Sequence, residues 1–399
     1  MLRQAVVLVG GAGTRLGSLT SDTPKPMLPI HGTPFLEFLL RNIARHGFED
    51  IVLLAHHHVG KIREHFDGSS IGRTKIRVVT EREKAGTGGA LREASDVLED
   101  TFLLANGDSV FDFNYLALYQ AYLRANVTVA IALREVPDVS RYGHVMLNDK
   151  GTVVHFSEKS GNQGQAGLIG GGIYILNRQI LEKIRPGNVS LETEILPNLV
   201  TENAIIGKQF DGFFLDIGLP KTYSEAQSSI PAWERRKVVF LDRDGTINRD
   251  SGYTHMVEDL EFVPDAPEAI RHCNEAGRLV IVVSNQAGIA RGFYSAEDVD
   301  TFHKAINIQL QNHGAHIDAF YYCPHHPEGT VANLSKVCDC RKPGTKMLED
   351  ACRDWPINLE GAVLIGDKKS DLDAATAFGI RGLLTDGTDL MECIQKADL

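Results

Sequence analysis

Short, continuous apolar runs alternate with stretches of helical periodicity along the whole chain. In the first half, the runs AVVLVGG at 5–11 and DIVLLAH at 50–56 flank the amphipathic stretch FLEFLLRNIARHG at 35–47. In the second half, KVVFL at 237–241 and LVIVVSN at 279–285 enclose a similar helical stretch. Continuous apolar runs suit strands that are buried on both faces. The alternation therefore predicts parallel sheets covered by helices, which is an α/β architecture.

The length of the chain, 399 residues, exceeds what one hydrophobic core usually organises. A polar stretch, LPKTYSEAQSSIPAWERR, leads from the first half into the new apolar run at 237–241. We therefore expect two doubly wound, Rossmann-like domains, residues 1–225 and residues 237–399, joined by a linker at 226–236.

Composition and charge narrow the class of partner. Hydrophobic residues make up 43% of the chain and charged residues 23%, which is typical of a globular protein. The net charge of -11 argues against nucleic acid as a partner, because protein surfaces that bind nucleic acid carry an excess of basic residues. No apolar run is long enough to cross a bilayer, and the N-terminus lacks the pattern of a signal peptide. We expect a cytoplasmic protein with small anionic substrates and no membrane partner; the sequence leaves open whether it forms an oligomer.

The first apolar run leads directly into a glycine-rich turn, GGAGTRLG. Such a turn lets backbone N–H groups approach phosphates, and nearby cations can neutralise their charge. One of these cations, Lys25, stands between two prolines that fix the loop around it. The candidate nucleotide-binding residues here are Gly10, Gly11, Gly13, Thr14, Arg15 and Lys25, and the last two are also candidate catalytic residues.

The stretch GAGTRLGSLTSDTPKPM resembles the signature of the nucleotidyltransferases that make nucleoside-diphosphate sugars. The resemblance covers about residues 2 to 225 and implies further site residues. The segment GTGGAL would lie under the nucleobase through Gly86, Thr87 and Gly88. Asp108 and Asp216 would hold Mg²⁺, with Asp108 also beside the nucleotide. The sugar and its phosphate would be contacted by Glu158, Lys159, Gly171 and Gly172. In this chemistry a sugar-phosphate oxygen attacks the α-phosphorus, so positioning and charge neutralisation suffice.

The second half opens with KVVFLDRDGTIN, which places Asp242 and Asp244 two residues apart after a strand. Such a pair can share one Mg²⁺ while Asp242 attacks phosphorus and Asp244 transfers protons. The motif resembles the first motif of the haloacid-dehalogenase-like phosphatases, and the other motifs follow in order. The resemblance implies phosphate binding by Ser284 and Asn285, a catalytic Lys342, and a Mg²⁺ site made by Asp242, Asp244 and Asp367.

Cysteines and histidines gather between the second and third of these motifs. The pattern C-x-H, twelve residues, C-x-C predicts a structural Zn²⁺ site with three sulfurs and one nitrogen. Its ligands would be Cys323, His325, Cys338 and Cys340. His326 could replace His325, although the family pattern favours His325. A closed site of this kind would order the loop that carries Arg341 and Lys342.

Together with DSGY at 250–253 and NQAGIARG at 285–292, this zinc loop resembles the D-glycero-D-manno-heptose 1,7-bisphosphate 7-phosphatases. One departure is GTKM after RKP, where the family commonly has a different turn. The resemblance implies that Asp250, Tyr253, Arg291, Arg341 and Lys368 contact the substrate, with Arg291 as a discriminating residue.

These patterns predict a bifunctional enzyme that removes the 7-phosphate of heptose 1,7-bisphosphate and joins the heptose 1-phosphate to a nucleotide. By resemblance to heptose-1-phosphate guanylyltransferases, the nucleoside triphosphate would be GTP and the product GDP-heptose. One alternative keeps both chemistries with another sugar, such as mannose, and a histidinol-phosphate-like phosphatase. In a further alternative, one half is a regulatory domain that binds a sugar phosphate without turnover.

Overall fold

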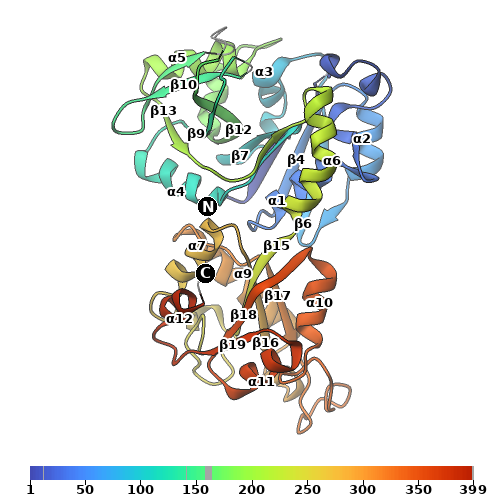
Figure 1. Cartoon of the computed structure of the whole chain (residues 1–399), viewed down its shortest axis with the longest axis vertical. Coiled ribbons are helices and arrows are strands. Elements are labelled where there is room, and N and C mark those ends of the chain that lie inside the picture. The colour runs from blue at the N-terminus through green and yellow to red at the C-terminus, as the bar shows by residue number, and fades with distance from the viewer. Residues whose placement is uncertain (12, 141, 158–163, 398–399) are drawn as a thin grey trace. The chain divides into compact units, whose positions relative to one another are not determined.

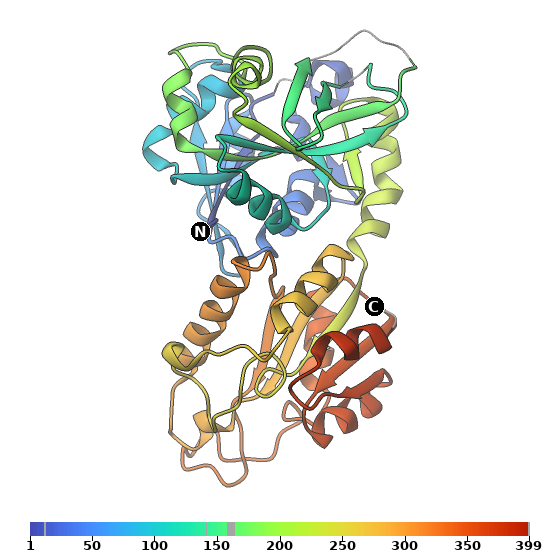
Figure 2. The same cartoon turned by 90° about the vertical axis from the view of Figure 1, so that its left-hand side faces the viewer.

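A computed structural model describes residues 1–11, 13–140, 142–157 and 164–397. Two compact units follow one another along the chain, Met1–Trp233 and Glu234–Leu399 (Figures 1 and 2). Within the described ranges, no helix has both the length and the apolar character needed to cross a lipid bilayer.

Four parallel strands form the centre of the first unit, in the order β7-β1-β4-β6. Their bounds are Gln4–Leu8 for β1, Asp50–Ala55 for β4, Thr74–Thr80 for β6 and Thr101–Asn106 for β7. Consecutive residues of these strands face different cores. Val7 and Leu53 pack in one apolar cluster with helix α1 (Phe35–Ala44), and Val6 and Val52 pack in the other with helix α3 (Gly86–Glu93). The strands are therefore buried on both faces, as their continuous apolar runs predicted.

Antiparallel strands extend this sheet beyond β7, so the prediction of a parallel sheet holds only for its centre. Strand β12 is antiparallel to β7, and both β9 and β10 are antiparallel to β12. The strand that pairs with β7 on this side, β12, begins some 60 residues further along the chain, so the local rhythm of strands and helices does not reveal its direction. The bounds are β9 Val129–Val136, β10 His144–Leu147, β11 Val153–Ser157, β12 Gly167–Asn177 and β13 Ile205–Gln209. The other helices are α2 Val59–Phe66, α4 Tyr115–Ala125 and α5 Leu196–Thr201, and the short strands are β2 Pro29–Ile30, β3 Thr33–Pro34, β5 Ser70–Ile71, β8 Ser109–Phe111 and β14 Phe214–Asp216.

Helix α6 (Pro220–Glu234) ends the first unit, and β15 (Arg236–Leu241) opens the second. Residues 226–236, which the sequence assigned to a linker, form the end of this helix and the start of this strand. Ala226 and Ile230 are fully buried in the core of the first unit. Most of the expected linker is thus part of that unit's packing.

The second unit has a purely parallel sheet in the order β17-β16-β15-β18-β19. The new strands are β16 Leu279–Asn285, β17 Ala319–Cys323, β18 Ile357–Gly366 and β19 Arg381–Leu384. Its helices are α7 Ala266–Glu275, α8 Ala287–Ala290, α9 Ala296–Gln311, α10 Lys346–Asp354, α11 Lys369–Phe378 and α12 Leu390–Lys396. Open α/β sheets bind ligands outside the carboxyl ends of their strands. Asp242, Ser284 and Asp367 stand at such ends of β15, β16 and β18.

Candidate active sites

A short antiparallel pair of strands brings together the two aspartates predicted to bind metal in the first unit. Strands β8 and β14 pair Ser109 with Asp216, which sets Asp216 beside Asp108. Lys25 Nζ lies 2.6 Å from Asp108 Oδ2 and 3.3 Å from Asp216 Oδ1. Although they are far apart in the sequence, Lys25, Asp108 and Asp216 therefore form one charged cluster.

The surroundings of this cluster leave room for a ligand. The lysine is buried, whereas 40% of the Asp108 side chain is exposed. The Gly218 N–H donates to Asp216 Oδ1 at 2.6 Å, and a Cβ at Gly218 would lie 3.0 Å from Lys25 Nζ. Carboxylate oxygens are the ligands that Mg²⁺ prefers, so two converging carboxylates fit a divalent cation. Lys25 is a monovalent counter-charge and leaves the carboxylate pair with net negative charge.

The glycine-rich loop after β1 has the open backbone that a phosphate-binding turn needs. Gly13 has a left-handed backbone conformation, with φ of 61°, and its carbonyl accepts a hydrogen bond from Thr20 Oγ1 at 3.0 Å. A Cβ at Gly11 would meet no heavy atom within 4 Å. Arg15 is exposed beyond this loop. Glu158 and Lys159 lie outside the described residues, as does the side chain of Thr14.

The glycines of GTGGAL have packing roles in the structure. A Cβ at Gly86 would lie 2.6 Å from the Val189 carbonyl oxygen, and that carbonyl accepts from the Gly88 N–H at 2.9 Å. Thr87 Oγ1 donates to Glu192 Oε2 at 2.6 Å. These contacts join the start of α3 to the segment at 187–192. Nucleotide binding by Gly86, Thr87 and Gly88 remains a prediction.

Gly171 and Gly172 bring β12 close to the turn that carries Asp108. A Cβ at Gly171 would lie 2.3 Å from the Phe111 ring. Gly172 has φ of 74°, and a Cβ there would lie 3.2 Å from Ser109 Oγ. Both positions therefore require glycine for close approach. Their predicted contact with the sugar remains a prediction.

In the second unit, Lys342 occupies the centre of a buried charge network. Its Nζ lies 2.7 Å from Asp242 Oδ1 and 2.6 Å from Asp371 Oδ1, and it donates to the Val283 carbonyl at 2.6 Å. Burial acts to lower the pKa of Lys342, but the Asp242 and Asp371 carboxylates outweigh it and raise that pKa above its ordinary value. The two carboxylates therefore favour the cationic form of Lys342 beside the predicted nucleophile.

Asp371 was not predicted from the sequence, although GDKKSD places it four residues after Asp367, in the first turn of α11. Carboxylate oxygens of Asp242, Asp367 and Asp371 lie within 4.8 Å of one another. Burial raises the pKa of Asp367 to about 6; Lys368 opposes this shift, and the other two carboxylates add to it. Asp367 Oδ1 is buried and has no hydrogen-bond partner among the residues that the structure describes. The cluster therefore fits a divalent cation. Such an ion would offset the repulsion among the three carboxylates and would give Asp367 Oδ1 a partner.

The carboxylate of Asp244, predicted as a third metal ligand, is held by other side chains. Arg243 Nη2 donates to both of its oxygens at 2.7 and 2.8 Å. Gln286 Nε2 donates to Asp244 Oδ2 at 2.9 Å and to Ser284 Oγ at 2.8 Å, and Tyr294 donates to Gln286 Oε1. Gln286 and Tyr294 were not predicted, because no spacing in the sequence points to them. The network fixes the orientation of the Asp244 carboxylate, and its predicted roles in proton transfer and Mg²⁺ binding remain predictions. Asp371 is a further carboxylate beside Asp242 and Asp367, and it is itself held by Lys342 Nζ and the Lys368 N–H.

The predicted substrate residues are spread around this cluster. Lys368 Nζ lies 3.4 Å from Asp250 Oδ2 and 3.6 Å from Asp367 Oδ2. Arg291 pairs with Glu328 at 3.4 Å. Tyr253 is exposed, and its ring lies 4.8 Å from that of Phe293. Arg341, next to Lys342, is half-buried, and Asn285 binds the Lys342 backbone. The Asp250–Lys368 pair thus adjoins the metal cluster, while substrate contact by these residues stays a prediction.

The predicted zinc ligands converge in the described structure. The three cysteine sulfurs lie 3.0 to 3.5 Å apart, and His325 Nδ1 lies 3.2 Å from Cys340 Sγ and 3.7 Å from Cys323 Sγ. A tetrahedral Zn²⁺ with bonds of about 2.3 Å separates its sulfurs by roughly 3.8 Å, so the four side chains fit with a small expansion. His326 Nδ1 instead accepts a hydrogen bond from the Glu328 N–H. The geometry therefore favours His325 over His326.

Comparison with known families agrees with the geometry of the two units. The nucleotidyl transferase family model matches residues 4–232, more than half of the chain. The chain belongs to the nucleotidyl transferase family. A HAD-hydrolase-like model matches residues 339–389, which include Lys342, Asp367 and Asp371. The protein is therefore a nucleotidyl transferase that carries a HAD-like second unit.

Curated relatives match each unit of this nucleotidyl transferase separately. The chain is 42% identical over 156 residues to the D-glycero-beta-D-manno-heptose-1,7-bisphosphate 7-phosphatase of Rhodopseudomonas palustris, covering 39% of this chain and 87% of that protein. It is 34% identical over 221 residues to the D-glycero-alpha-D-manno-heptose 1-phosphate guanylyltransferase of Campylobacter jejuni, covering 55% of this chain and 96% of that protein.

A solved structure is similar to the nucleotidyl transferase unit. HddC from Yersinia pseudotuberculosis is 32% identical, with a TM-score of 0.52, and the match covers 57% of this chain and 99% of that one. The same protein complexed with GMP-PN gives a TM-score of 0.51.

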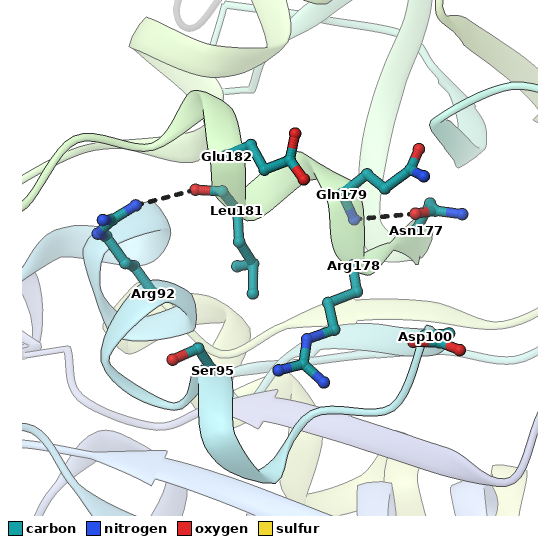
Figure 3. A pocket seen from close by; sticks show the side chains of 8 residues that line it. All are labelled: Arg92, Ser95, Asp100, Asn177, Arg178, Gln179, Leu181 and Glu182. Atoms are coloured by element: carbon teal, nitrogen blue, oxygen red, sulfur yellow. Dashed lines mark hydrogen bonds between the residues drawn. The ribbon is translucent and has the colours of Figure 1, made fainter.

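The nucleotidyl transferase unit also has a recess lined mostly by polar side chains (Figure 3). It lies at the amino end of β7, whereas the Lys25 cluster lies at the carboxyl end of that strand. It adjoins Asp100, just before β7 begins, whereas Asp108 follows the end of β7. Arg92 Nη1 donates to the Leu181 and Ile184 carbonyls, and Arg178 Nη1 donates to the Leu98 carbonyl. Both arginines therefore hold neighbouring backbone segments together, and we assign no function to the recess.

Proposed function

We propose that this nucleotidyl transferase is a bifunctional enzyme of GDP-heptose synthesis. Its second unit removes the 7-phosphate of D-glycero-D-manno-heptose 1,7-bisphosphate, and its first unit transfers GMP from GTP to the remaining 1-phosphate. The observation that carries the proposal is the presence of two separate charged clusters in one chain, Lys25 with two aspartates and Lys342 with two aspartates. The names of the relatives supply the sugar and the nucleotide. We place both reactions in the cytoplasm, where nucleoside triphosphates are available.

In the phosphatase reaction, an Asp242 oxygen attacks the 7-phosphorus while the bond to the sugar oxygen breaks. Asp244 gives its proton to that leaving oxygen. Asp244 then takes a proton from water, which attacks the aspartyl phosphate and releases inorganic phosphate and free Asp242. Lys342 holds the attacking carboxylate by its 2.7 Å contact. A Mg²⁺ bound by Asp242, Asp367 and Asp371 would neutralise the phosphoryl oxygens.

In the transferase reaction, a phosphate oxygen of heptose 1-phosphate attacks the α-phosphorus of GTP, and pyrophosphate leaves. No covalent enzyme intermediate is needed, so Lys25 and Arg15 act by holding charged oxygens in place. Asp108 and Asp216 would hold Mg²⁺, which supplies charge neutralisation for the triphosphate. The glycine-rich loop would receive the phosphates through its backbone N–H groups.

We assign a structural role to Zn²⁺ in the Cys323, His325, Cys338 and Cys340 cluster. With four protein ligands, such a site has no open position for substrate. Its loop leads directly into Arg341 and Lys342, so the metal would fix the backbone that presents the catalytic lysine.

The order of the two reactions also determines which anomer of heptose 1,7-bisphosphate the phosphatase unit must accept. Cleavage at C7 leaves the anomeric centre unchanged, so the bisphosphate and the 1-phosphate must share one configuration. The phosphatase relative is named for the beta sugar and the guanylyltransferase relative for the alpha sugar. If the two steps follow one another in this chain, its phosphatase unit takes the alpha bisphosphate.

Phosphorus NMR tests the proposal directly. With alpha-heptose 1,7-bisphosphate and Mg²⁺ alone, the 7-phosphate signal should disappear and heptose 1-phosphate should accumulate. Addition of GTP should then produce pyrophosphate and a sugar-diphosphate pair. Preferential loss of the anomeric phosphate would contradict the assignment, as would pyrophosphate release that does not depend on heptose 1-phosphate.

A further inference from the structure

Gln286 is a buried amide that the reactions described above do not use. It directly follows β16, and only 1% of the residue is exposed. Its Nε2 donates to Asp244 Oδ2 at 2.9 Å and to Ser284 Oγ at 2.8 Å. The amide group carries two hydrogens, so each hydrogen bond can use its own. One side chain therefore joins the predicted proton donor to a predicted phosphate-binding residue.

A tyrosine hydroxyl determines which way the Gln286 amide faces. Tyr294 Oη donates to Gln286 Oε1 at 2.8 Å. Burial raises the pKa of Tyr294 to about 12, so this hydroxyl keeps its proton and stays a donor at neutral pH. If the amide turned over, Gln286 Oε1 would face the Asp244 carboxylate, which is an acceptor against an acceptor. The Tyr294 hydrogen bond therefore favours the orientation that presents Nε2 to Asp244.

Close packing fixes the position of the Tyr294 ring. The residue is 8% exposed, and the His255 ring stacks on it with centroids 4.5 Å apart and planes at 22°. A Cβ at Gly288 would lie 2.1 Å from the tyrosine ring, so the absence of a side chain at Gly288 is what admits this ring. The hydroxyl that orients Gln286 is therefore held by its own surroundings.

The two groups that Gln286 contacts serve the same phosphoryl transfer. Because Ser284 Oγ accepts from Gln286, its own hydrogen can point to a phosphoryl oxygen. Asp244 Oδ1 is held by Arg243 and by Asn248 Nδ2, whereas Gln286 ties Oδ2 to the Ser284 side. The amide thus sets the carboxyl group of Asp244 relative to the phosphate that Ser284 would bind.

We propose that Gln286 positions Asp244 to protonate the leaving sugar oxygen, and that Tyr294 fixes the orientation of the Gln286 amide. The inference rests on the proposed phosphatase function and adds two positioning residues to it. As the bond from Asp242 to phosphorus forms, the bond from phosphorus to the sugar oxygen breaks. The electron pair stays on the sugar oxygen, which takes the proton of Asp244. Gln286 and Tyr294 exchange no proton in this step.

The test compares two substrates that carry a phosphoryl group on different leaving groups. Heptose 1,7-bisphosphate releases an alcohol, which needs a proton, whereas p-nitrophenyl phosphate releases a phenolate that is stable without one. Since kcat/KM includes the steps up to release of the leaving group, the ratio of the two kcat/KM values reports proton donation. Gln286→Ala should lower the ratio of heptose bisphosphate to p-nitrophenyl phosphate roughly 10- to 100-fold. An effect on phosphate binding by Ser284 acts on both substrates and cancels in the ratio.

Tyr294→Phe removes the hydroxyl and keeps the ring. It should lower the same ratio about three- to tenfold, which corresponds to the loss of one hydrogen bond. Tyr321→Phe is the matched control, because the hydroxyl of Tyr321 donates to Asp354 Oδ2 at 3.1 Å instead. The control should keep the wild-type ratio.

The outcomes separate this inference from the function on which it rests. If the wild-type chain hydrolyses both substrates and Gln286→Ala keeps the wild-type ratio, the inference alone fails. Should Gln286→Ala not fold, an unchanged ratio in Tyr294→Phe overturns the inference. If the wild-type chain hydrolyses neither substrate, the phosphatase proposal and the inference both fail. If it hydrolyses p-nitrophenyl phosphate but not the heptose bisphosphate, the sugar assignment fails, and an alkyl phosphate that the chain does hydrolyse gives the deciding ratio.

Discussion

Asn285 and Lys342 are joined by two reciprocal hydrogen bonds. Asn285 Nδ2 donates to the Lys342 carbonyl at 3.1 Å, and the Lys342 N–H donates to Asn285 Oδ1 at 2.9 Å. The end of β16 thereby holds the backbone of the residue whose Nζ contacts Asp242. The two hydrogen bonds fix the backbone of Lys342 to the end of β16, and phosphate binding by Asn285 remains a prediction.

Asn285→Ala should lower phosphatase kcat by up to about 100-fold, because a small displacement of Lys342 disturbs a site that depends on positioning. Loss of the two hydrogen bonds should also cost about 1 to 3 kcal/mol of stability. Phosphate release and thermal unfolding measure the two effects. Asn312→Ala, at an exposed position after α9, is the control. An unchanged kcat in Asn285→Ala would show that the two hydrogen bonds between Asn285 and Lys342 have no role in turnover.

The two activities should be separable, because their charged clusters belong to different units. Asp242→Asn should lower phosphate release by several orders of magnitude, since it removes the nucleophile, and leave pyrophosphate release from supplied heptose 1-phosphate intact. Asp108→Ala should do the reverse. Each variant is assayed for both products. Loss of both activities in either folded variant would refute the two-site arrangement.

Elemental analysis should find about one equivalent of zinc per chain, since closed Cys and His sites bind with roughly 10 kcal/mol or more. Cys338→Ser should lose the metal, lower the unfolding temperature and reduce phosphatase activity through the loop that carries Lys342. Cys352→Ser changes a thiol outside the cluster and should retain zinc. Full phosphatase activity and unchanged stability in a zinc-free wild-type protein would rule out a structural role.

Glu81→Gln should raise the unfolding temperature of the ligand-free protein at pH 8. Burial raises the pKa of Glu81, so the folded state holds its proton more tightly than the unfolded state does. The stability linked to this group is present below the ordinary glutamate pKa and is lost as pH rises through the raised value. Calorimetry at pH 8 and pH 5 should therefore show a gain that narrows on acidification. A lower unfolding temperature at pH 8 would contradict the argument, and Glu83→Gln should change little at either pH.

Local sequence patterns were sufficient to predict the strands that are continuous apolar runs. The run KVVFL predicted nearly the whole of β15, and LVIVVSN coincides with β16. Local patterns could not predict that β12 pairs with β7 in the antiparallel direction, because that direction depends on which distant segment supplies the partner strand. The pairing of β8 with β14, which sets Asp216 beside Asp108, is equally non-local.

The same distinction applies to the site residues. Lys25, Asp108, Asp242 and Lys342 stand in dense motifs. The structure pairs Lys25 with Asp108 in the first unit and Lys342 with Asp242 in the second. Gln286 and Asp371 were missed for different reasons. The carboxylate spacing around Asp367 could have revealed Asp371, whereas Gln286 stands out only through its burial and its hydrogen bond to the distant Asp244.

Helix α6 has a consequence for dissecting the chain into halves. Its residues Ala226 and Ile230 complete the core of the first unit, and Trp233 donates a hydrogen bond from Nε1 to Asp112 Oδ2 at 2.9 Å. A cut after residue 225 would uncover apolar surface and remove one hydrogen-bond donor to Asp112, whereas a cut between Glu234 and Arg236 would spare both. In evolutionary terms, a fusion joint placed there would leave the hydrophobic core of each unit whole.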